Sequence, residues 1–206
     1  MKLLLVRHGQ TEWNQLNKMQ GQKDSPLTGR GRLQAELAGR ALSACHVTHF
    51  FCSDAGRAVE TVEQIVKANA GLPAPRQDPR LRELNYGDWE GLVRKEIEDG
   101  YADLFRTYKR NPEHFRAPNG ESFQDVQHRF LSLLAEIPRG DGETCLIVTH
   151  GGLIRVALLA LTNRGLHELP ALPLIREASI TSLEWAHGGW TVLGLGQTEH
   201  LDGLSA

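Results

Sequence analysis

Short apolar runs that stop abruptly at polar side chains recur along the chain. Continuous apolar segments of four to six residues are typical of strands that are buried on both faces of a sheet. The carboxyl end of such a strand opens onto solvent, so the residues that follow it are candidates for a functional site. Residues 3–6 form such a run, and the segments 47–52 and 144–149, which also contain polar residues, are predicted as two further strands. The polar residues that end or follow the three strands are Arg7, His8, Ser53 and His150.

Segments with a helical period lie between these runs. Thr28 can cap a helix whose apolar face we expect to contain Leu33, Leu37, Ala41 and Leu42. Gly71 is placed to end a second helix. The further elements that we expect are helices over 57–70, 122–137 and 151–161, a possible short strand within 71–80, and a hairpin of 179–185 with 190–195.

The alternation of strands and helices predicts an α/β sandwich. In open α/β sheets, ligands bind at the carboxyl ends of the strands, where the polar residues that follow the three predicted strands would meet. The chain of 206 residues suits a single domain covering 1–206. Residues 93–118 mix aromatic and basic side chains, which favours a short helical cap over the site.

Composition excludes several classes of protein. The 23 basic and 25 acidic side chains nearly cancel, to a formal charge of −2, which argues against nucleic acid as a partner. The 3 cysteines form no Cys-x-x-Cys pair, so neither a disulfide framework nor a thiolate zinc site is expected. The apolar run after Met1 is too short for a signal peptide or a membrane span. We expect a cytoplasmic protein with a small-molecule partner and no membrane association, and leave a homodimer open.

Familiar catalytic motifs are missing from the sequence. It contains no Gly-x-x-x-x-Gly-Lys, no His-Glu-x-x-His and no Gly-x-Ser-x-Gly, which disfavours P-loop kinases, zinc proteases and lipase-type hydrolases. What remains is a pair of histidines and several arginines. Arginine forks bind phosphate oxygens, a neutral imidazole can attack phosphorus, and a second histidine can stabilise the transferring group. The residues therefore indicate phosphoryl chemistry.

One segment, Leu5-Val-Arg-His-Gly-Gln-Thr-Glu-Trp-Asn14, resembles the signature of the histidine phosphatase superfamily, the phosphoglycerate mutase-like proteins. The resemblance spans the whole chain, because further blocks follow in the family's order. These blocks are Gln20-Gly21, Asp24-Ser-Pro-Leu-Thr28, Ser53-Asp-Ala-Gly-Arg-Ala-Val-Glu-Thr61, Leu81-Arg-Glu83, Gly87-Asp-Trp-Glu-Gly91, Gly120-Glu-Ser122 and Val148-Thr-His-Gly-Gly152.

The resemblance implies a three-layer α/β/α sandwich and a site that uses no metal and no cofactor. It implies that His8 is the nucleophile that accepts the phosphoryl group and that Glu83 is the proton donor. The other positions that it implies are Arg7, Arg57 and His150 in the phosphate pocket, Asn14 and the Gly151 backbone as further phosphate contacts, and Gln20 with Gly21 at the pocket entrance.

Three functions stay open at this point. A metal-independent phosphomonoesterase with a phosphohistidine intermediate is favoured, because Gly151-Gly152 and the short cap differ from the Gly-Asn and the longer basic cap of true mutases. The chain looks most like the broad-specificity and α-ribazole phosphatase branches. A primer-dependent phosphoglycerate mutase is the first alternative. A non-catalytic module that binds a phosphorylated ligand is the second, although no matched catalytic position is lost.

Overall fold

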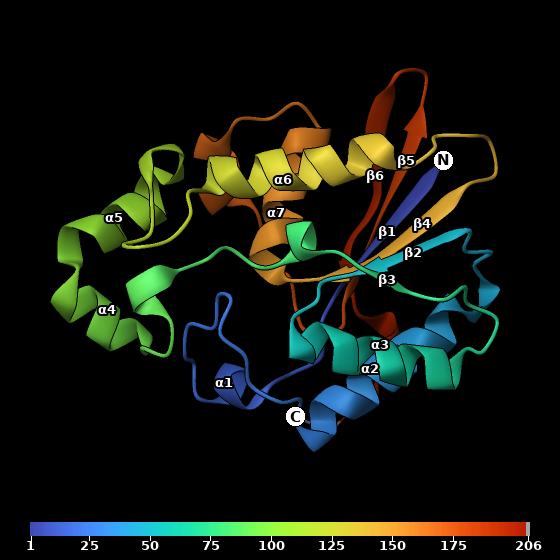
Figure 1. Cartoon of the computed structure of the whole chain (residues 1–206), viewed down its shortest axis with the longest axis horizontal. Coiled ribbons are helices and arrows are strands. Elements are labelled where there is room, and N and C mark those ends of the chain that lie inside the picture. Colours follow the sequence, from blue (N-terminus) through green and yellow to red (C-terminus); the bar gives the residue numbers. More distant parts are fainter. Residues whose placement is uncertain (205–206) are drawn as a thin grey trace.

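The computed structural model describes residues 1–204, and its centre is a six-stranded sheet in the order β3-β2-β4-β1-β5-β6 (Figure 1). Strands β1 to β4 run parallel to one another, whereas β5 and β6 are antiparallel additions beside β1. The strands are β1 Lys2–Arg7, β2 His49–Cys52, β3 Arg76–Gln77, β4 Thr144–Thr149, β5 Ile180–Ala186 and β6 Gly189–Gln197. The three strands predicted from the sequence are thus β1, β2 and β4, and the predicted hairpin is β5 with β6.

Helices cover both faces of the sheet, so the α/β/α sandwich is confirmed (Figure 1). Successive side chains of a strand point to opposite faces, so Leu4 and Val6 pack with α2 and α3, whereas Leu3 and Leu5 pack with α6 and α7. The helices are α1 Glu12–Gln15, α2 Gly29–Ala41, α3 Gly56–Ala68, α4 Arg94–Gly100, α5 Ala102–Arg110, α6 Phe123–Glu136 and α7 Gly151–Leu161.

The apolar face expected for the helix after Thr28 is wrong in part. Thr28 does cap α2, but Leu33 is 42% exposed, and of the expected residues only Leu42, just past the helix, is buried. Apart from Gln34, the buried residues of α2 are glycines and alanines, and a Cβ on Gly39 would lie only 2.6 Å from the Ile65 carbonyl oxygen of α3. Small side chains let the two helix backbones approach closely, and a search for large apolar residues overlooks such a face.

Residues 93–118 contain α4, α5 and a 3₁₀ helix at Pro112–His114, and they project beyond the sheet on the side of the carboxyl ends of β1, β2 and β4 (Figure 1). Trp89 is fully buried beneath them and contacts the rings of Tyr101, Phe105, Tyr108 and Phe115. We call residues 93–118 the cap. Its aromatic side chains pack it onto the rest of the molecule.

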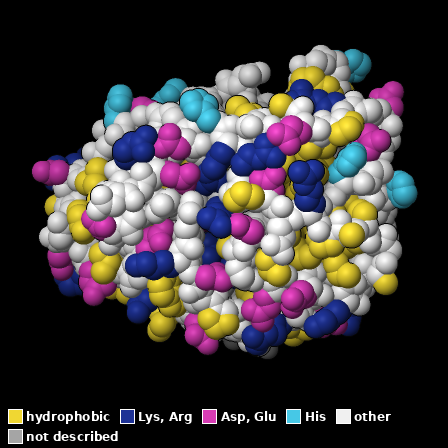
Figure 2. All heavy atoms as spheres, in the orientation of Figure 1, with side chains coloured by type: hydrophobic (Ala, Val, Ile, Leu, Met, Phe, Trp, Pro, Cys, Tyr) yellow, Lys and Arg dark blue, Asp and Glu magenta, His cyan; other side chains and the backbone are white. Residues whose placement is uncertain are grey.

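Charged side chains of both signs lie on the surface of this nearly neutral protein. Figure 2 shows basic and acidic side chains interspersed over one face of the molecule. Within the described residues, no helix is both long and apolar enough to span a membrane.

Candidate active site

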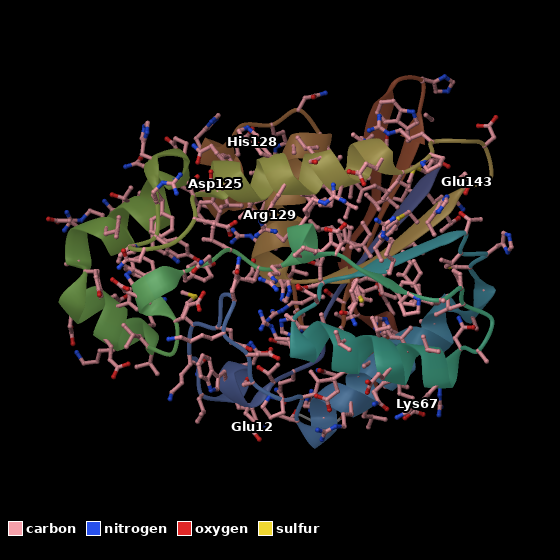
Figure 3. The ribbon with its side chains drawn as sticks, in the orientation of Figure 1. Glu12, Lys67, Asp125, His128, Arg129 and Glu143 are labelled. Carbon is pink, nitrogen blue, oxygen red and sulfur yellow. The ribbon has the colours of Figure 1, made fainter. Side chains whose placement is uncertain are left out.

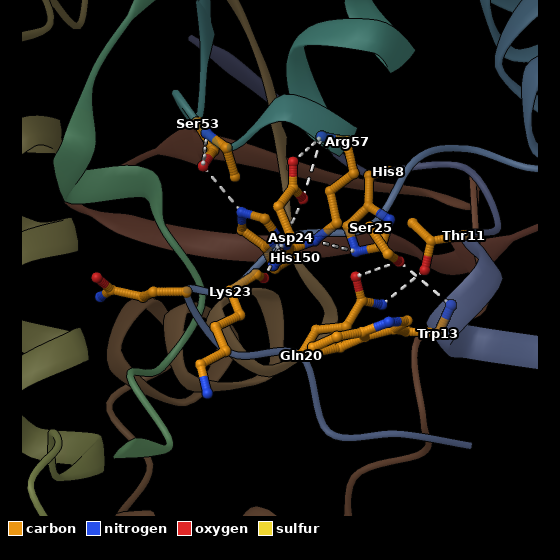
Figure 4. Close-up of polar contacts among 12 residues, drawn as sticks. His8, Thr11, Trp13, Gln20, Lys23, Asp24, Ser25, Ser53, Arg57 and His150 are labelled. Atoms are coloured by element: carbon orange, nitrogen blue, oxygen red, sulfur yellow. Dashed lines mark hydrogen bonds and ion pairs between the residues drawn. The ribbon is translucent and has the colours of Figure 1, made fainter. Parts of the chain in front are cut away.

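Two histidines lie side by side because β1 and β4 are neighbours. Arg7 pairs in register with Thr149, so the next residue of each strand, His8 and His150, emerges at the same edge of the sheet. Their ring centroids are 5.2 Å apart, and both side chains are buried (Figure 4). The parallel pairing thus joins residues 142 positions apart in the sequence into one site.

Arg57, from the first turn of α3, fixes the hydrogen-bonding state of both rings. Its Nε lies 3.3 Å from His8 Nε2 and its Nη2 lies 3.1 Å from His150 Nδ1. A guanidinium can only donate, so both of these ring nitrogens accept. His8 therefore carries its proton on Nδ1 and donates it to the Gly9 carbonyl, 2.8 Å away, while His150 donates from Nε2 to Ser53 Oγ, 2.8 Å away.

Burial holds both histidines in the neutral form. Desolvation is the main cause that lowers the pKa of His8 well below 6.5, and the charges of Arg57 and Arg7 lower it further. The pKa of His150 is also lowered well below 6.5, first by desolvation and then by Arg57. A neutral His8 whose Nε2 carries a lone pair is the form that can act as a nucleophile.

Arg57 itself is 1% exposed, and a buried cation is stable only when its charge and donors are satisfied. Its Nη1 donates to Asp24 Oδ1 at 2.8 Å and to the Lys23 carbonyl at 2.9 Å. Its Nη2 donates to the Gly21 carbonyl at 2.6 Å. The loop of residues 20–24 therefore forms a collar around the guanidinium (Figure 4).

Glu90 holds this collar in place. Its Oε1 accepts from the Gln22 and Tyr86 backbone N–H groups, and its Oε2 accepts from that of Lys23. Gly21 has a φ of +58°, and a Cβ there would lie 2.0 Å from Glu90 Oε1, so the close approach requires glycine. Glu90 thereby ties the collar of Arg57 to the segment that carries Glu83.

Arg7 approaches the histidines from the end of β1. Its guanidinium donates to the Ile175 carbonyl at 2.5 Å and forms an ion pair with Glu177 at 3.0 Å. Its Nε is buried and has no hydrogen-bond partner among residues 1–204, so this donor is available to an additional oxygen. Gly151 allows the approach, because a Cβ there would already lie 3.3 Å from Arg7 Cδ.

The Glu83 side chain lies against the first turn of α7, the helix that begins directly after His150. Its Oε2 accepts from the Gly152 N–H at 2.9 Å, and its Oε1 accepts from the Leu153 and Leu84 N–H groups at 3.0 Å each. These three backbone donors fix the orientation of the Glu83 carboxyl group. A Cβ on Gly152 would lie 2.5 Å from Glu83 Oε1, so the second glycine of the Gly-Gly pair leaves room for the carboxyl group.

The backbone of Glu83 is anchored from α6. Arg129 extends inward from this helix, and its Nη2 donates to the Glu83 carbonyl at 3.0 Å (Figure 3). Glu121 pairs with Arg129 at 3.1 Å and accepts from the Asn85 N–H. Glu83 is therefore fixed at both its side chain and its main chain.

Asn14 and Gln20 meet at Thr11. The Asn14 Oδ1 accepts from the Thr11 N–H and hydroxyl, both at 3.0 Å, so only the NH₂ end of this amide can serve an anion. Gln20 is buried, and its amide contacts Thr11 at 2.7 Å and Ser25 at 3.4 Å. Its side chain therefore supports the loop from inside, and it is the Gly21 carbonyl that reaches Arg57.

A cavity of about 380 Å³ leads from this site toward the cap. Arg7 and Asn14 line its inner end, and Phe105, Tyr108 and Lys109 of α5 line its outer end. Its size is within the range of small-molecule sites.

The structure thus brings together His8, His150, Arg7, Arg57 and Glu83, with Asn14, Gly21 and Gly151 around them. The sequence assigned no positioning role to Asp24, Glu90 or Arg129. Asp24 and Glu90 lie inside the matching sequence blocks, which is the signal that could have drawn attention to them, whereas nothing in the sequence marks Arg129. Within residues 1–204 no group of three histidine, cysteine or acidic side chains is arranged to hold a metal ion.

This arrangement can bind a tetrahedral anion and react with it. Arginines and a second imidazole surround a nucleophilic nitrogen, which suits the charge that spreads over a transferring phosphoryl group. The carboxyl group of Glu83, which is held at the first turn of α7, can move a proton to or from an oxygen atom.

The comparisons with known proteins agree with one another in matching nearly the whole chain. Residues 3–198 match the model of the histidine phosphatase superfamily, branch 1. A protein of Enterobacter sp. (strain 638) named "Probable phosphoglycerate mutase GpmB" is 35% identical over 98% of this chain and 95% of its own. The structure of Bacillus stearothermophilus YhfR is 36% identical with a TM-score of 0.88, over 98% of this chain and 99% of that one.

A mycobacterial glucosyl-3-phosphoglycerate phosphatase, solved with VO₃, is 30% identical with a TM-score of 0.85, over 96% of this chain and 99% of that one. The relatives are thus named both as mutases and as phosphatases. Sequence and fold agree over almost the entire length, and we conclude that this chain belongs to the histidine phosphatase superfamily.

Proposed function

We propose that the protein is a metal-independent phosphomonoesterase that works through a phosphohistidine on His8. The observation that carries this proposal is the tautomer of His8. Its Nδ1–H donates a hydrogen bond to the Gly9 carbonyl, so the lone pair of Nε2 points toward Arg57 and His150. A nitrogen in this state can attack phosphorus without first losing a proton.

In the first half-reaction, Nε2 of His8 forms a bond to phosphorus while the bond from phosphorus to the ester oxygen breaks. The departing alkoxide takes a proton from the carboxyl group of Glu83. The phosphoryl oxygens replace His8 as the partner of the Arg57 Nε–H, and they also receive bonds from Arg7 and Asn14. This exchange converts contacts of the free site into contacts that stabilise the transition state.

In the second half-reaction, the Glu83 carboxylate removes a proton from water as the water oxygen attacks phosphorus. The bond between phosphorus and His8 breaks, inorganic phosphate leaves, and Glu83 regains its proton. The net reaction is ester plus water to alcohol plus phosphate, so neither redox chemistry nor a metal is required. Activity that survives exhaustive chelation would support this scheme.

A phosphoglycerate mutase is the second candidate, because relatives that are 35% identical carry that name. The mutase reaction needs a pocket that keeps water from the phosphohistidine. Hydrolysis is favoured here by the Gly151-Gly152 pair and the short cap, both of which differ from the pattern of mutases.

The product distinguishes the two candidates. The purified protein is incubated with 3-phosphoglycerate and a bisphosphoglycerate primer, and inorganic phosphate and 2-phosphoglycerate are measured over time. We expect phosphate to form faster than 2-phosphoglycerate, and the opposite ratio would establish the mutase. Binding of either compound without any turnover would instead favour a non-catalytic module.

A further inference from the structure

The cavity between the phosphate pocket and the cap has an uneven distribution of charge. Its inner end holds the ion pair of Arg7 and Glu177, at 3.0 Å, which is neutral as a unit. Its outer part is lined by three further cations, Lys18, Arg94 and Lys109. Glu177 is the one carboxylate among its lining residues. The cavity therefore becomes more positive with distance from the phosphate pocket.

These three cations differ in how far they are already neutralised. Arg94 forms an ion pair with Glu98 at 2.7 Å, and the Glu98 side chain does not line the cavity. The ammonium of Lys18 lies 5.8 Å from the centre of the Trp13 ring. No carboxylate of the described chain forms an ion pair with it. Lys109 on α5 has no ion-pair partner within residues 1–204. Two positive charges are thus available to a ligand.

Part of the cavity wall is apolar. Met19, Ile97, Phe105 and Tyr108 line it, and the Arg94 guanidinium lies 5.5 Å from the centre of the Phe105 ring. Aromatic faces and a flexible methionine accommodate flat apolar groups. The cavity volume of about 380 Å³ also exceeds what the leaving group of a small phosphorylated hydroxy acid would fill.

We infer that this cavity selects phosphomonoesters whose leaving group carries a second anionic group, separated from the ester oxygen by a flat, ring-sized apolar spacer. The inference rests on the proposed function, because it requires the phosphate to lie at Arg7 and His8. The phosphate then fixes one end of the substrate, the apolar wall contacts the spacer, and Lys109 and Lys18 bind the distal anion. An anion directly beside the phosphate would gain less, because Glu177 already pairs with Arg7 there.

Three matched substrates test the inference. They are 4-methylphenyl phosphate, 4-(carboxymethyl)phenyl phosphate and 4-(aminomethyl)phenyl phosphate, in which a methylene group insulates the phenol oxygen from the charged substituent. We expect kcat/KM to fall in the order carboxymethyl, methyl, aminomethyl, with roughly three- to tenfold between successive members, and the differences to shrink at high salt.

The variant Lys109→Gln should reduce the ratio of kcat/KM for the carboxymethyl ester to that for the methyl ester by roughly three- to tenfold. The matched control is Arg106→Gln. Arg106 lies on the same helix, pairs with Asp103 and does not line this cavity, so the ratio should not change. Equal kcat/KM for the three esters, or an equal effect of both variants, would overturn the inference.

A second readout keeps this inference separate from the proposed function. Affinities of the three esters for the His8→Ala protein are measured by calorimetry, which requires no turnover. If the wild type hydrolyses none of the esters but the carboxymethyl ester binds most tightly, the proposed hydrolysis is wrong and the subsite stands. If all three are hydrolysed but bind equally, the hydrolysis stands and the subsite is wrong.

Discussion

The phosphate pocket and the cap cavity adjoin each other but are constructed differently. In the pocket, Arg57 is 1% exposed and each of its nitrogens has an acceptor: Nε bonds to His8, and the two Nη atoms bond to the loop of residues 20–24. In the cavity, Lys109 is exposed and without an ion-pair partner in the described chain. The part in which the proposed phosphoryl chemistry would take place is preorganised, whereas Lys109 in the proposed leaving-group subsite is not fixed by any ion pair in the described chain. Preorganised donors cost no rearrangement at the moment of reaction.

The largest effect is expected from removing the nucleophile of the phosphate pocket. We expect His8→Ala to reduce turnover to at most about 10⁻⁴ of the wild-type value, because the arginines can bind a phosphoryl group but cannot accept it. Intact-mass measurement after rapid quenching without acid should show one added phosphoryl group on the wild type and none on the variant. His128→Ala is the matched control, since His128 is an exposed residue of α6 (Figure 3). Near-normal turnover of His8→Ala would refute the assignment.

The second prediction separates proton transfer from phosphate binding. A nitrophenolate leaves as a stabilised anion, whereas an alkoxide needs a proton in the transition state. Glu83→Gln should therefore lower kcat/KM for an alkyl phosphate by on the order of 10² to 10⁴, and much less for nitrophenyl phosphate. Glu12→Gln, a change at an exposed carboxyl of α1, should affect neither substrate. Equal losses for the two substrates would mean that Glu83 positions the site without donating the proton.

The third prediction tests whether the collar of Arg57 depends on Glu90. In Glu90→Gln the new NH₂ group faces the Lys23 N–H in place of an acceptor, so the loop of residues 20–24 should shift. A misplacement of this kind typically costs on the order of tenfold to a hundredfold in kcat/KM. The loss should be equal for alkyl and nitrophenyl phosphates, unlike that of Glu83→Gln.

The control for Glu90 is Glu96→Gln. Glu96 also accepts a backbone N–H, that of Val93, but at the exposed start of α4. Its replacement should leave kcat/KM within about twofold of the wild type, since it touches neither the collar nor Glu83. Losses of the same size in both variants would show that Glu90 has no special positioning role.

The smallest effect concerns pH. The pKa values of His8 and His150 are lowered below 6.5, mainly by burial. Both rings are neutral in the folded and the unfolded chain above pH 6.5, whereas below it the unfolded chain binds protons that the folded chain does not. The free energy of unfolding should therefore fall on acidification below pH 6.5, by up to about 1.4 kcal/mol per pH unit for each ring.

Two measurements check this expectation. Urea unfolding between pH 7 and pH 5 gives the slope, which should be shallower in His150→Asn. The ring resonances of His8 and His150 should titrate with midpoints well below that of free histidine, which is measured in the same sample as the reference. Titration of either ring with a midpoint near 6.5 would contradict the burial argument.

The candidate catalytic residues could be predicted from the sequence because their positions depend on local patterns. A continuous apolar run predicts a buried parallel strand. Because the carboxyl ends of such strands lie at one edge of the sheet, Arg7, His8 and His150 were expected to lie close together. The matching blocks then added Arg57 and Glu83. The buried face of α2 escaped the same reasoning, because close helix packing selects small side chains that carry no strong hydrophobic signal.

The remaining features depend on contacts between distant segments. Arg129 reaches the Glu83 carbonyl across 46 positions, and Glu90 reaches the Lys23 N–H across 67. A sequence pattern reports the period of one element and says nothing of which partner a side chain will find in another. The sequence alone therefore determined the elements, the edge where the reactive side chains gather and the family. Only the tertiary structure decided the tautomer of His8, the collar around Arg57 and the distribution of charge in the cap cavity, because each of these requires several segments to be packed together.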